Sequence, residues 1–212
     1  VLPAATACAL ATETIEIGIG VFNPFNRHPT LMAMELGAID EISGGRAILG
    51  IGAGVPHAIN KITRFENVAE AISAALAIAG PLLAGEEISH QGKVFSAERA
   101  KLTYKPVRAH LPIYLAAMGE QVLRVCGRSA DGLLISNMCP PRFTSWAIDV
   151  MTEAARAVGR NGPDHIVKYV PCVAADARTA ARRAVKPVIG AMLGDYFRAY
   201  APPPEAIAAM GG

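Results

Sequence analysis

The feature that most constrains this chain is the turn at residues 43–46 and the apolar segment directly behind it. A helical run ends in the tight turn Ser43-Gly44-Gly45-Arg46, and a short apolar strand follows at once. The strand opens into the glycine-rich segment 50–54, where the lack of side chains lets the backbone approach a ligand. This helix-to-strand step is typical of parallel α/β folds, whose active sites lie at the carboxyl ends of the strands.

The composition indicates a globular protein with a large core. The chain has 212 residues, of which 52% are hydrophobic and 18% are charged, and this balance is not that of a disordered chain. The net charge of +2 comes without a block of basic residues, so a nucleic-acid partner is not expected. Glycine, proline or a charge interrupts each apolar run, so no membrane-spanning segment is expected.

The cysteines point to a reducing compartment. Cys8, Cys126, Cys139 and Cys172 lie far apart and form no Cys-x-x-Cys pair. We expect them to be reduced, buried thiols of a cytoplasmic protein rather than a disulfide framework or a zinc site. The sequence has no cluster of His, Cys and carboxylate residues at metal-ligand spacing, so no metal is expected.

Apolar periodicity and turn residues predict alternating helices and strands. Helices are predicted at residues 2–13, 30–42, 65–79, 120–129, 141–158 and 179–200, and strands at 15–22, 46–50, 112–117, 132–136 and 166–174. Residues 55–64 are predicted as a loop, and the polar stretch around Gly92 predicts a hairpin insertion at about 86–106. This alternation of helices and strands predicts βα units with a parallel sheet, in a single domain spanning residues 1–212.

The residues alone are compatible with two architectures. One is an open, doubly wound sheet, and the other is a (β/α)8 barrel that lacks some of its strands. The chain begins at Val1 with an alanine-rich helix, which we interpret as the continuation of earlier elements. The sequence is therefore expected to be a fragment.

Several short motifs, taken together and in order, resemble one protein family. They are Arg27-His28-Pro29, residues 40–46, residues 50–54, Gly85-Glu86 with residues 92–95, residues 112–117, and Gly127 with residues 130–132. The family they resemble is the bacterial-luciferase-like superfamily of flavin- and deazaflavin-dependent oxidoreductases. Residues 23–29 are most similar to the branch that contains methylenetetrahydromethanopterin reductase, which uses the deazaflavin coenzyme F-420.

The resemblance implies the α/β fold of this family, a (β/α)8 TIM barrel, in an incomplete form. Aligned with the family, the chain has barrel strands 3 to 7 and lacks strands 1, 2 and 8. In the family the first two strands carry acidic residues near the reacting ring, so no catalytic residue is assigned in this chain. The resemblance also implies a homodimer.

Cofactor contacts are implied at the strand ends. The Gly20–Val21 step matches the place where the family has a bulge, with a non-prolyl cis peptide against the rear face of the ring. Glycines in the 50–54 loop would let the backbone approach the ring or its polyol tail. The expected contacts from this part of the chain are Gly20, Val21, Asn23, Gly52, Gly54 and Asn60, with His57 as an alternative to Asn60.

Segment 116–121 is the candidate phosphate site, because a strand ends there, small residues turn and a helix begins. The first N–H groups of a helix have no helical partners and carry the positive end of its dipole. The family holds the cofactor phosphate at this junction, which implies contacts from Ala116, Ala117, Met118, Gly119, Glu120 and Gln121. Glu120 is unfavourable near an anion unless its side chain points away.

Ser136 and Asn137 end the next strand and are expected to face the substrate. Sugar-phosphate dehydrogenases of the superfamily have a lysine in this loop, so uncharged residues here argue against a sugar phosphate. Asp40 and Arg46 are expected to make structural contacts at their turn, and His28 is expected to cap a helix.

These expectations lead to one function with two alternatives. The first is hydride transfer between coenzyme F-420 and a small organic substrate, with a methylenetetrahydromethanopterin-like compound as the leading candidate. The second keeps the fold and uses FMN, as a luciferase-like monooxygenase does. The third is an inactive, truncated homologue whose unpaired strand edges invite pairing or aggregation.

Overall fold

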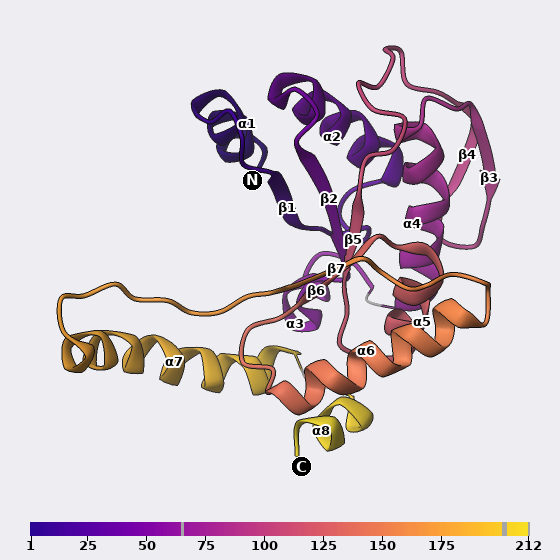
Figure 1. The fold of residues 1–212 in the computed structure, drawn as a ribbon. Helices are drawn as coiled ribbons and strands as arrows, with labels where there is room; N and C mark the ends of the chain where they lie inside the picture. Colours follow the sequence, from indigo (N-terminus) through magenta and orange to yellow (C-terminus); the bar gives the residue numbers. More distant parts are fainter. Residues whose placement is uncertain (65, 201–202, 212) are drawn as a thin grey trace.

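A parallel sheet of five strands forms the centre of the protein. The computed structural model describes residues 1–64, 66–200 and 203–211, without the side chains of His57 and residues 195–200 (Figure 1). The strand order is β1-β2-β5-β6-β7, and all neighbours pair in parallel. The strands are β1 (Ile17–Phe22), β2 (Ala47–Gly52), β5 (Ile113–Ala116), β6 (Gly132–Ile135) and β7 (His165–Lys168).

The helices of the described part are α1 (Leu2–Ala11), α2 (Pro29–Ser43), α3 (Pro56–Ile59), α4 (Val68–Leu83), α5 (Glu120–Ser129), α6 (Pro141–Arg156), α7 (Arg178–Tyr200) and α8 (Pro204–Met210). α1, α2, α4, α5 and α6 follow one another along the outside of the sheet (Figure 1). α1 packs on α2, α2 on α4, α4 on α5 and α5 on α6. This is an incomplete (β/α)8 barrel, with five of the eight parallel strands in the part of the chain that the structure describes.

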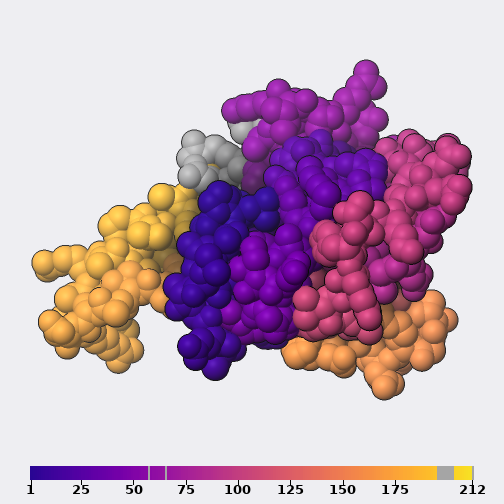
Figure 2. All heavy atoms as spheres, turned by 90° about the horizontal axis from the view of Figure 1, so that it is seen from above, coloured from indigo at the N-terminus to yellow at the C-terminus, as the bar shows by residue number. Residues whose placement is uncertain are grey.

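Two further features lie outside this layer. β3 (Ile88–Gln91) and β4 (Ser96–Ala100) pair antiparallel, within the segment where the sequence predicts a hairpin. α7 projects away from the sheet and forms an arm in both the ribbon and the space-filling view (Figures 1 and 2). None of the helices in the described ranges combines the length and the apolar character that crossing a bilayer requires.

The two faces of the sheet differ in side-chain volume. The outer face packs against the helices, where Met32, Leu36, Leu49 and Leu115 are fully buried in the main core. Alternate residues point to the inner face, and there the side chains are small or absent at many positions. That face carries only a small apolar cluster, which consists of Ile48, Tyr114 and Leu134 with Val21 and Ala116 against it.

The turn after α2 has the structural role that the sequence predicts. Gly44 ends the helix in the left-handed conformation, with φ 67°, and its N–H bonds to the carbonyl oxygens of Asp40 and Glu41. The buried Asp40 carboxylate accepts hydrogen bonds from the Ala47 N–H at 3.1 Å and from the Arg108 guanidinium at 2.6 Å. These bonds fix where β2 starts.

Arg46 and His28 also match their predicted structural roles. The Arg46 guanidinium donates to the carbonyl oxygens of Ala9, Thr12 and Ile15, so it ties the end of α1 to the start of β1. The His28 ring accepts a hydrogen bond from the Thr30 N–H at 3.3 Å and caps α2. Both residues therefore stabilise the scaffold.

Three predicted elements need correction, and one observed helix was not predicted. The strand predicted at 166–174 ends at Lys168, because its partner β6 ends at Ile135 and Pro171 has no N–H for further pairing. The helix predicted at 65–79 starts at Val68 and runs on to Leu83, since Leu82 and Leu83 are buried; residue 65 lies outside the described ranges. The loop predicted at 55–64 contains the short helix α3, and α8 was not predicted.

The cysteines also differ from expectation. Cys126 and Cys139 are buried, but Cys8 and Cys172 are exposed, and none of the four forms a disulfide. Cys8 lies on an exposed side of α1, and Cys172 lies beyond the end of β7, so neither is covered by the core. Burial raises the pKa of the Cys126 thiol to about 12, which keeps that thiol protonated and unreactive at neutral pH.

The pair of Asp40 and Arg108 gives a stability prediction. Replacing Arg108 with alanine leaves a buried carboxylate without its cation, so we expect a loss of about 3 kcal/mol in the free energy of unfolding. Arg64 is the control, because its ion pair with Glu66 is 3.8 Å long and exposed on both sides, and Arg64→Ala should cost about 0.5 kcal/mol or less. Urea denaturation measures both; equal losses would contradict the assignment.

Candidate functional site

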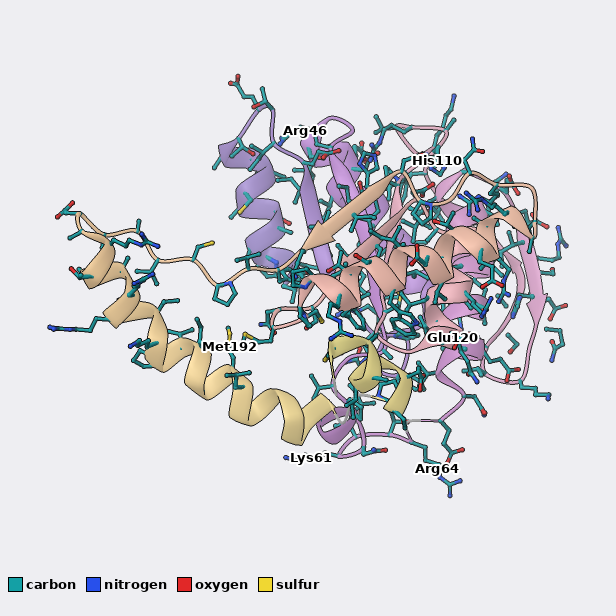
Figure 3. All side chains as sticks on the ribbon, turned by 60° about the horizontal axis from the view of Figure 1, so that its bottom comes forward. Arg46, Lys61, Arg64, His110, Glu120 and Met192 are labelled. Atoms are coloured by element: carbon teal, nitrogen blue, oxygen red, sulfur yellow. The ribbon has the colours of Figure 1, made fainter. Side chains whose placement is uncertain are left out.

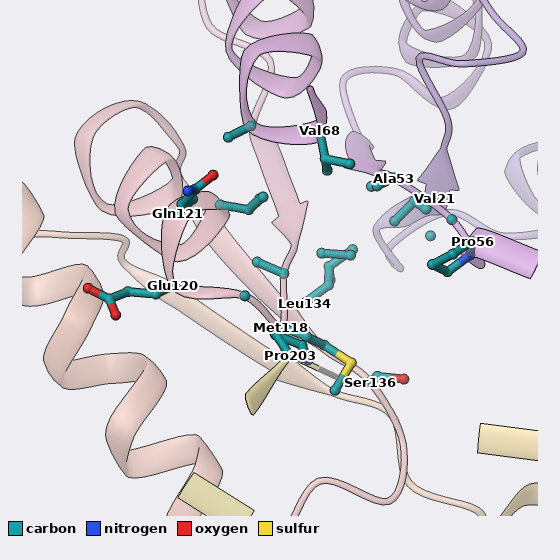
Figure 4. Close-up of a pocket in the computed structure, with 18 of the residues that line it drawn as sticks. Val21, Ala53, Pro56, Val68, Met118, Glu120, Gln121, Leu134, Ser136 and Pro203 are labelled. Atoms are coloured by element: carbon teal, nitrogen blue, oxygen red, sulfur yellow. The ribbon is translucent and has the colours of Figure 1, made fainter. Parts of the chain in front are cut away.

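The carboxyl ends of the central strands surround a cavity of about 680 Å³ (Figure 4). It lies at the opposite end of the strands from Arg46, near the start of α5, where Glu120 lies (Figure 3). The predicted cofactor and substrate residues that line it are Gly20, Val21, Gly52, Gly54, Ala116, Ala117, Met118, Gly119, Glu120, Gln121 and Ser136. The strand end at Val21 and the helix start at Gly119 thus open onto one shared cavity. That these residues bind a cofactor stays a prediction.

The wall formed by β1 and β2 is built from backbone. The Gly20–Val21 peptide is cis, as the resemblance implies, and the pairing of β1 with β2 is irregular between Ile19 and Phe22. A Cβ on Gly52 would lie 2.8 Å from Cγ2 of Val21. Only glycine therefore lets β2 approach Val21 this closely.

The end of β7 reaches across the inner face to β1. The Tyr169 hydroxyl donates a hydrogen bond to the Gly20 carbonyl oxygen at 3.4 Å, and Tyr169 lines the cavity. A Cβ on Gly20 would overlap this hydroxyl. Tyr169 was not predicted as a site residue, because nothing in the local sequence indicates that β7 lies opposite β1.

The start of α5 presents free backbone donors to the cavity. Gly119 is the N-cap and makes no side-chain cap bond. The first N–H with a helical partner is that of Leu123, which bonds to the Gly119 carbonyl oxygen at 3.1 Å. The N–H groups of Glu120, Gln121 and Val122 therefore have no partner within the helix, and all three residues line the cavity. Such a helix start attracts anions.

The Glu120 carboxylate does not oppose an anion at this position. Figure 4 shows the side chain of Glu120 pointing away from Val21 and Met118. Its carboxylate accepts a hydrogen bond from the Arg124 guanidinium at 2.8 Å, and Arg124 also pairs with Glu153 on α6. The hydrogen bond that Arg124 donates to Glu120, followed by the negative charge of Glu153, raises the pKa of Arg124. The unfavourable charge noted in the sequence is thus neutralised outside the cavity.

Three predicted contacts are not among the residues that line the cavity. The Asn23 amide donates to the Ala53 carbonyl oxygen at 2.8 Å and accepts from the Phe25 N–H, so it holds the loop after β1 together. Asn60 ends α3 and is exposed, and the Asn137 amide donates to the sulfur of Met192 at 3.7 Å. The side chain of His57 lies outside the described part of the structure.

Other lining residues come from segments that the sequence analysis did not connect with the site. The start of α4 contributes Asn67, Val68 and Ala69, and the segment at α8 contributes Pro203 and Glu205. The start of α4 follows β2 in the chain, so its position at the strand ends was open to prediction. Glu205 is more distant in sequence, so only the tertiary structure shows that it lines the cavity.

The charges around the cavity are all of one sign. Among the described side chains that line it, the charged ones are the carboxylates of Glu120 and Glu205, and no lysine, arginine or histidine is present. The described residues also contain no group of three or more His, Cys, Asp or Glu side chains that could hold a metal ion. Recognition of an anion here depends on backbone donors.

The fold is that of a luciferase-like barrel protein. The profile of the family described as luciferase-like monooxygenase matches residues 1–209, so the chain belongs to this family. This confirms the resemblance seen in the sequence.

Two reductases are similar to this chain. The 5,10-methylenetetrahydromethanopterin reductase of Archaeoglobus fulgidus is 34% identical over 185 residues, which are 87% of this chain and 55% of that protein. The structure of the coenzyme F420 dependent tetrahydromethanopterin reductase from Methanopyrus kandleri matches with a TM-score of 0.81 and 26% identity, over 89% of this chain and 59% of that one.

An FMN complex is similar as well. The oxygenating constituent of 3,6-diketocamphane monooxygenase from Pseudomonas putida, solved with FMN, matches with a TM-score of 0.70 and 26% identity, over 92% of this chain and 59% of that one. The chain spans about half the length of the curated relatives that it matches.

Proposed function

We propose that this chain belongs to an oxidoreductase that transfers a hydride between the deazaflavin coenzyme F-420 and a small organic substrate. The observation that carries the proposal is the shared cavity between the Gly20–Val21 step and the start of α5. The names of the similar proteins support the deazaflavin, since the reductase from Methanopyrus kandleri is described as coenzyme F420 dependent. The name of the relative from Archaeoglobus fulgidus also supports a methylenetetrahydromethanopterin-like substrate.

The residues present suit a flat ring with an anionic tail. Val21, Ala116 and Leu134 form a small apolar surface on the inner face of the sheet, and all three line the cavity. The cavity volume lies within the range of about 300–1,000 Å³ that is usual for cofactor sites. At the other end, the three N–H groups at the start of α5 offer hydrogen bonds to an anion.

In this proposal the coenzyme, when bound, supplies the hydride chemistry and the protein supplies binding and shielding. The N–H groups of Glu120, Gln121 and Val122 anchor the tail, so that the ring lies at a fixed distance from the helix start. Val21 and Leu134 exclude water from one side of the ring. The main catalytic contribution of these residues is therefore positioning.

The substrate side of the cavity is uncharged in the described residues. Ser136 lines the cavity and offers a hydroxyl, and no lining lysine is present to bind a sugar phosphate. A neutral or weakly charged organic substrate fits this lining better than a sugar phosphate does. This supports the one-carbon carrier over the sugar phosphate as the substrate class.

Titration with each cofactor tests the proposal. We expect coenzyme F-420 to bind more tightly than FMN, because the reductase from Methanopyrus kandleri, which is described as coenzyme F420 dependent, has the higher TM-score of the two cofactor-linked structures compared above. Quenching of cofactor fluorescence measures binding, and the absorbance change on adding a reduced one-carbon carrier measures hydride transfer. Tight binding of FMN without binding of coenzyme F-420 would overturn the deazaflavin and favour the FMN monooxygenase.

A proline at the start of α5 tests the anion anchor. Glu120 is the first residue of the helix, where proline is well tolerated, and Gly119 before it is extended with φ −86° and ψ 147°. Glu120→Pro therefore removes one N–H donor without breaking the helix, and Glu120→Ala removes the same carboxylate while keeping the donor.

Relative to Glu120→Ala, Glu120→Pro should bind coenzyme F-420 about tenfold more weakly, because one hydrogen bond to a charged group is lost. Fluorescence titration gives the two affinities, and urea denaturation checks that the two variants have similar stability. Equal affinities in two equally stable variants would show that this donor does not contact the tail.

A further inference from the structure

The side chain of Tyr169 lies on the inner face of the sheet. β7 ends at Lys168, but the Tyr169 N–H still donates to the Ile135 carbonyl oxygen at 3.0 Å, so the backbone continues along β6. His165, at the start of β7, stacks on Tyr114 of the inner-face cluster, with ring centroids 5.7 Å apart. Side chains alternate along a strand, so Tyr169, four residues later, lies on the same face.

The hydroxyl of Tyr169 lies beside the apolar surface of the cavity. A Cβ on Gly20 would overlap this hydroxyl and would lie 3.9 Å from Cδ1 of Leu134. Leu134 belongs, with Val21 and Ala116, to the apolar surface on which the proposed ring lies. The hydroxyl is therefore a polar group at the edge of an apolar wall. A few polar groups placed in this way fix the orientation of a ligand in a mostly apolar pocket.

A comparison with Tyr104 shows that the Tyr169 hydroxyl is held weakly. The Tyr104 hydroxyl donates to the Met34 carbonyl oxygen at 2.6 Å, away from the cavity, and O–H···O bonds usually measure about 2.5–3.0 Å. The bond from Tyr169 to the Gly20 carbonyl oxygen is longer, at 3.4 Å. Hydrogen bonds in a site without its ligand are often long and shorten in the complex. A better acceptor on a ligand can thus replace the Gly20 carbonyl oxygen.

The charged side chains of the lining cannot donate to a ligand carbonyl. Within the described lining they are Glu120 and Glu205, and ionised carboxylates accept hydrogen bonds but donate none. A phenol hydroxyl is a neutral donor. Tyr169 is 44% exposed and lines the cavity, so a ligand can reach its side chain.

We propose that Tyr169 is a ligand-binding residue whose hydroxyl donates a hydrogen bond to a carbonyl oxygen of the bound ring. This inference rests on the proposed function, because it concerns the ring in the same cavity. Deazaflavin and flavin rings both carry two carbonyl oxygens on their pyrimidine edge, so the hydroxyl recognises a group that the two rings share. The bond directs this edge of the ring toward the gap between β1 and β7.

The test removes one hydroxyl from each of the two tyrosines. Tyr169→Phe keeps the aromatic ring and removes the proposed donor. Tyr104→Phe is the matched control, because it removes a hydroxyl that also donates to a backbone carbonyl oxygen, but outside the cavity. The ligands are coenzyme F-420 and riboflavin. Fluorescence titration gives each affinity, absorbance at saturation gives the band position of the bound ring, and urea denaturation gives the stability of each protein.

We expect Tyr169→Phe to bind both rings about three- to tenfold more weakly, because one hydrogen bond is lost. The absorption band of the bound ring should also shift, since a hydrogen bond to a ring carbonyl changes the energy of the transition. Tyr104→Phe should bind both rings as the unchanged chain does, with the same band position. Its urea midpoint should fall further than that of Tyr169→Phe, because it loses the shorter bond.

The results separate ligand contact from a structural role. Unchanged affinity in Tyr169→Phe, a weaker affinity without a band shift, or an equal loss of affinity in Tyr104→Phe overturns the inference and leaves the proposed function in place. Binding of riboflavin that depends on the Tyr169 hydroxyl, without binding of coenzyme F-420, overturns the proposed function alone. Failure of both rings to bind the unchanged chain overturns both.

Discussion

The lack of side-chain volume on the inner face of the sheet is the constraint on which the cavity depends. A Cβ on Gly50 would overlap the carbonyl oxygen of Ile19, and one on Gly52 would lie 2.8 Å from Cγ2 of Val21 and 3.0 Å from Cβ of Ala116. Glycine at these positions brings β1 and β2 close together and leaves space above the strand ends. The apolar outer face supplies the stability, because the helices bury it along β1, β2, β5 and β6. The sheet thus has one packed face, which stabilises the fold, and one open face, which borders the cavity.

The second theme is anion recognition without a cation. Helix α5 starts at the rim of the cavity with three N–H groups that have no helical partner, and the charged side chains of the described lining are carboxylates. Backbone donors are fixed by the helix and lose little entropy on binding. A site of this kind binds by hydrogen-bond geometry more than by charge. The pairing of Glu120 with Arg124 holds one of these carboxylates away from the cavity.

Much of this architecture was predictable from the sequence because it depends on local rules. The Ser43-Gly44-Gly45-Arg46 turn, the β-strand that follows and the start of α5 at Glu120 are encoded by neighbouring residues, and the family motifs gave the cis step at Gly20. The predicted contacts at Asn23, Asn60 and Asn137 failed to reach the cavity lining, because short polar side chains near strand ends also satisfy loop backbone, as Asn23 does. Tyr169 and Glu205 were missed because they join the site through long-range packing. The local sequence pattern therefore predicts where the strands end, but it does not predict which side chains from distant segments reach those strand ends.

The central claim is that the end of β1 and the start of α5 hold two ends of one cofactor. Backbone amide chemical shifts of the nitrogen-15-labelled chain, followed by NMR during addition of coenzyme F-420, test this most directly. The account predicts that the amides of Val21 and of Glu120, Gln121 and Val122 shift together, with one common binding curve. Shifts confined to only one of these two places, or to residues away from both, would contradict it.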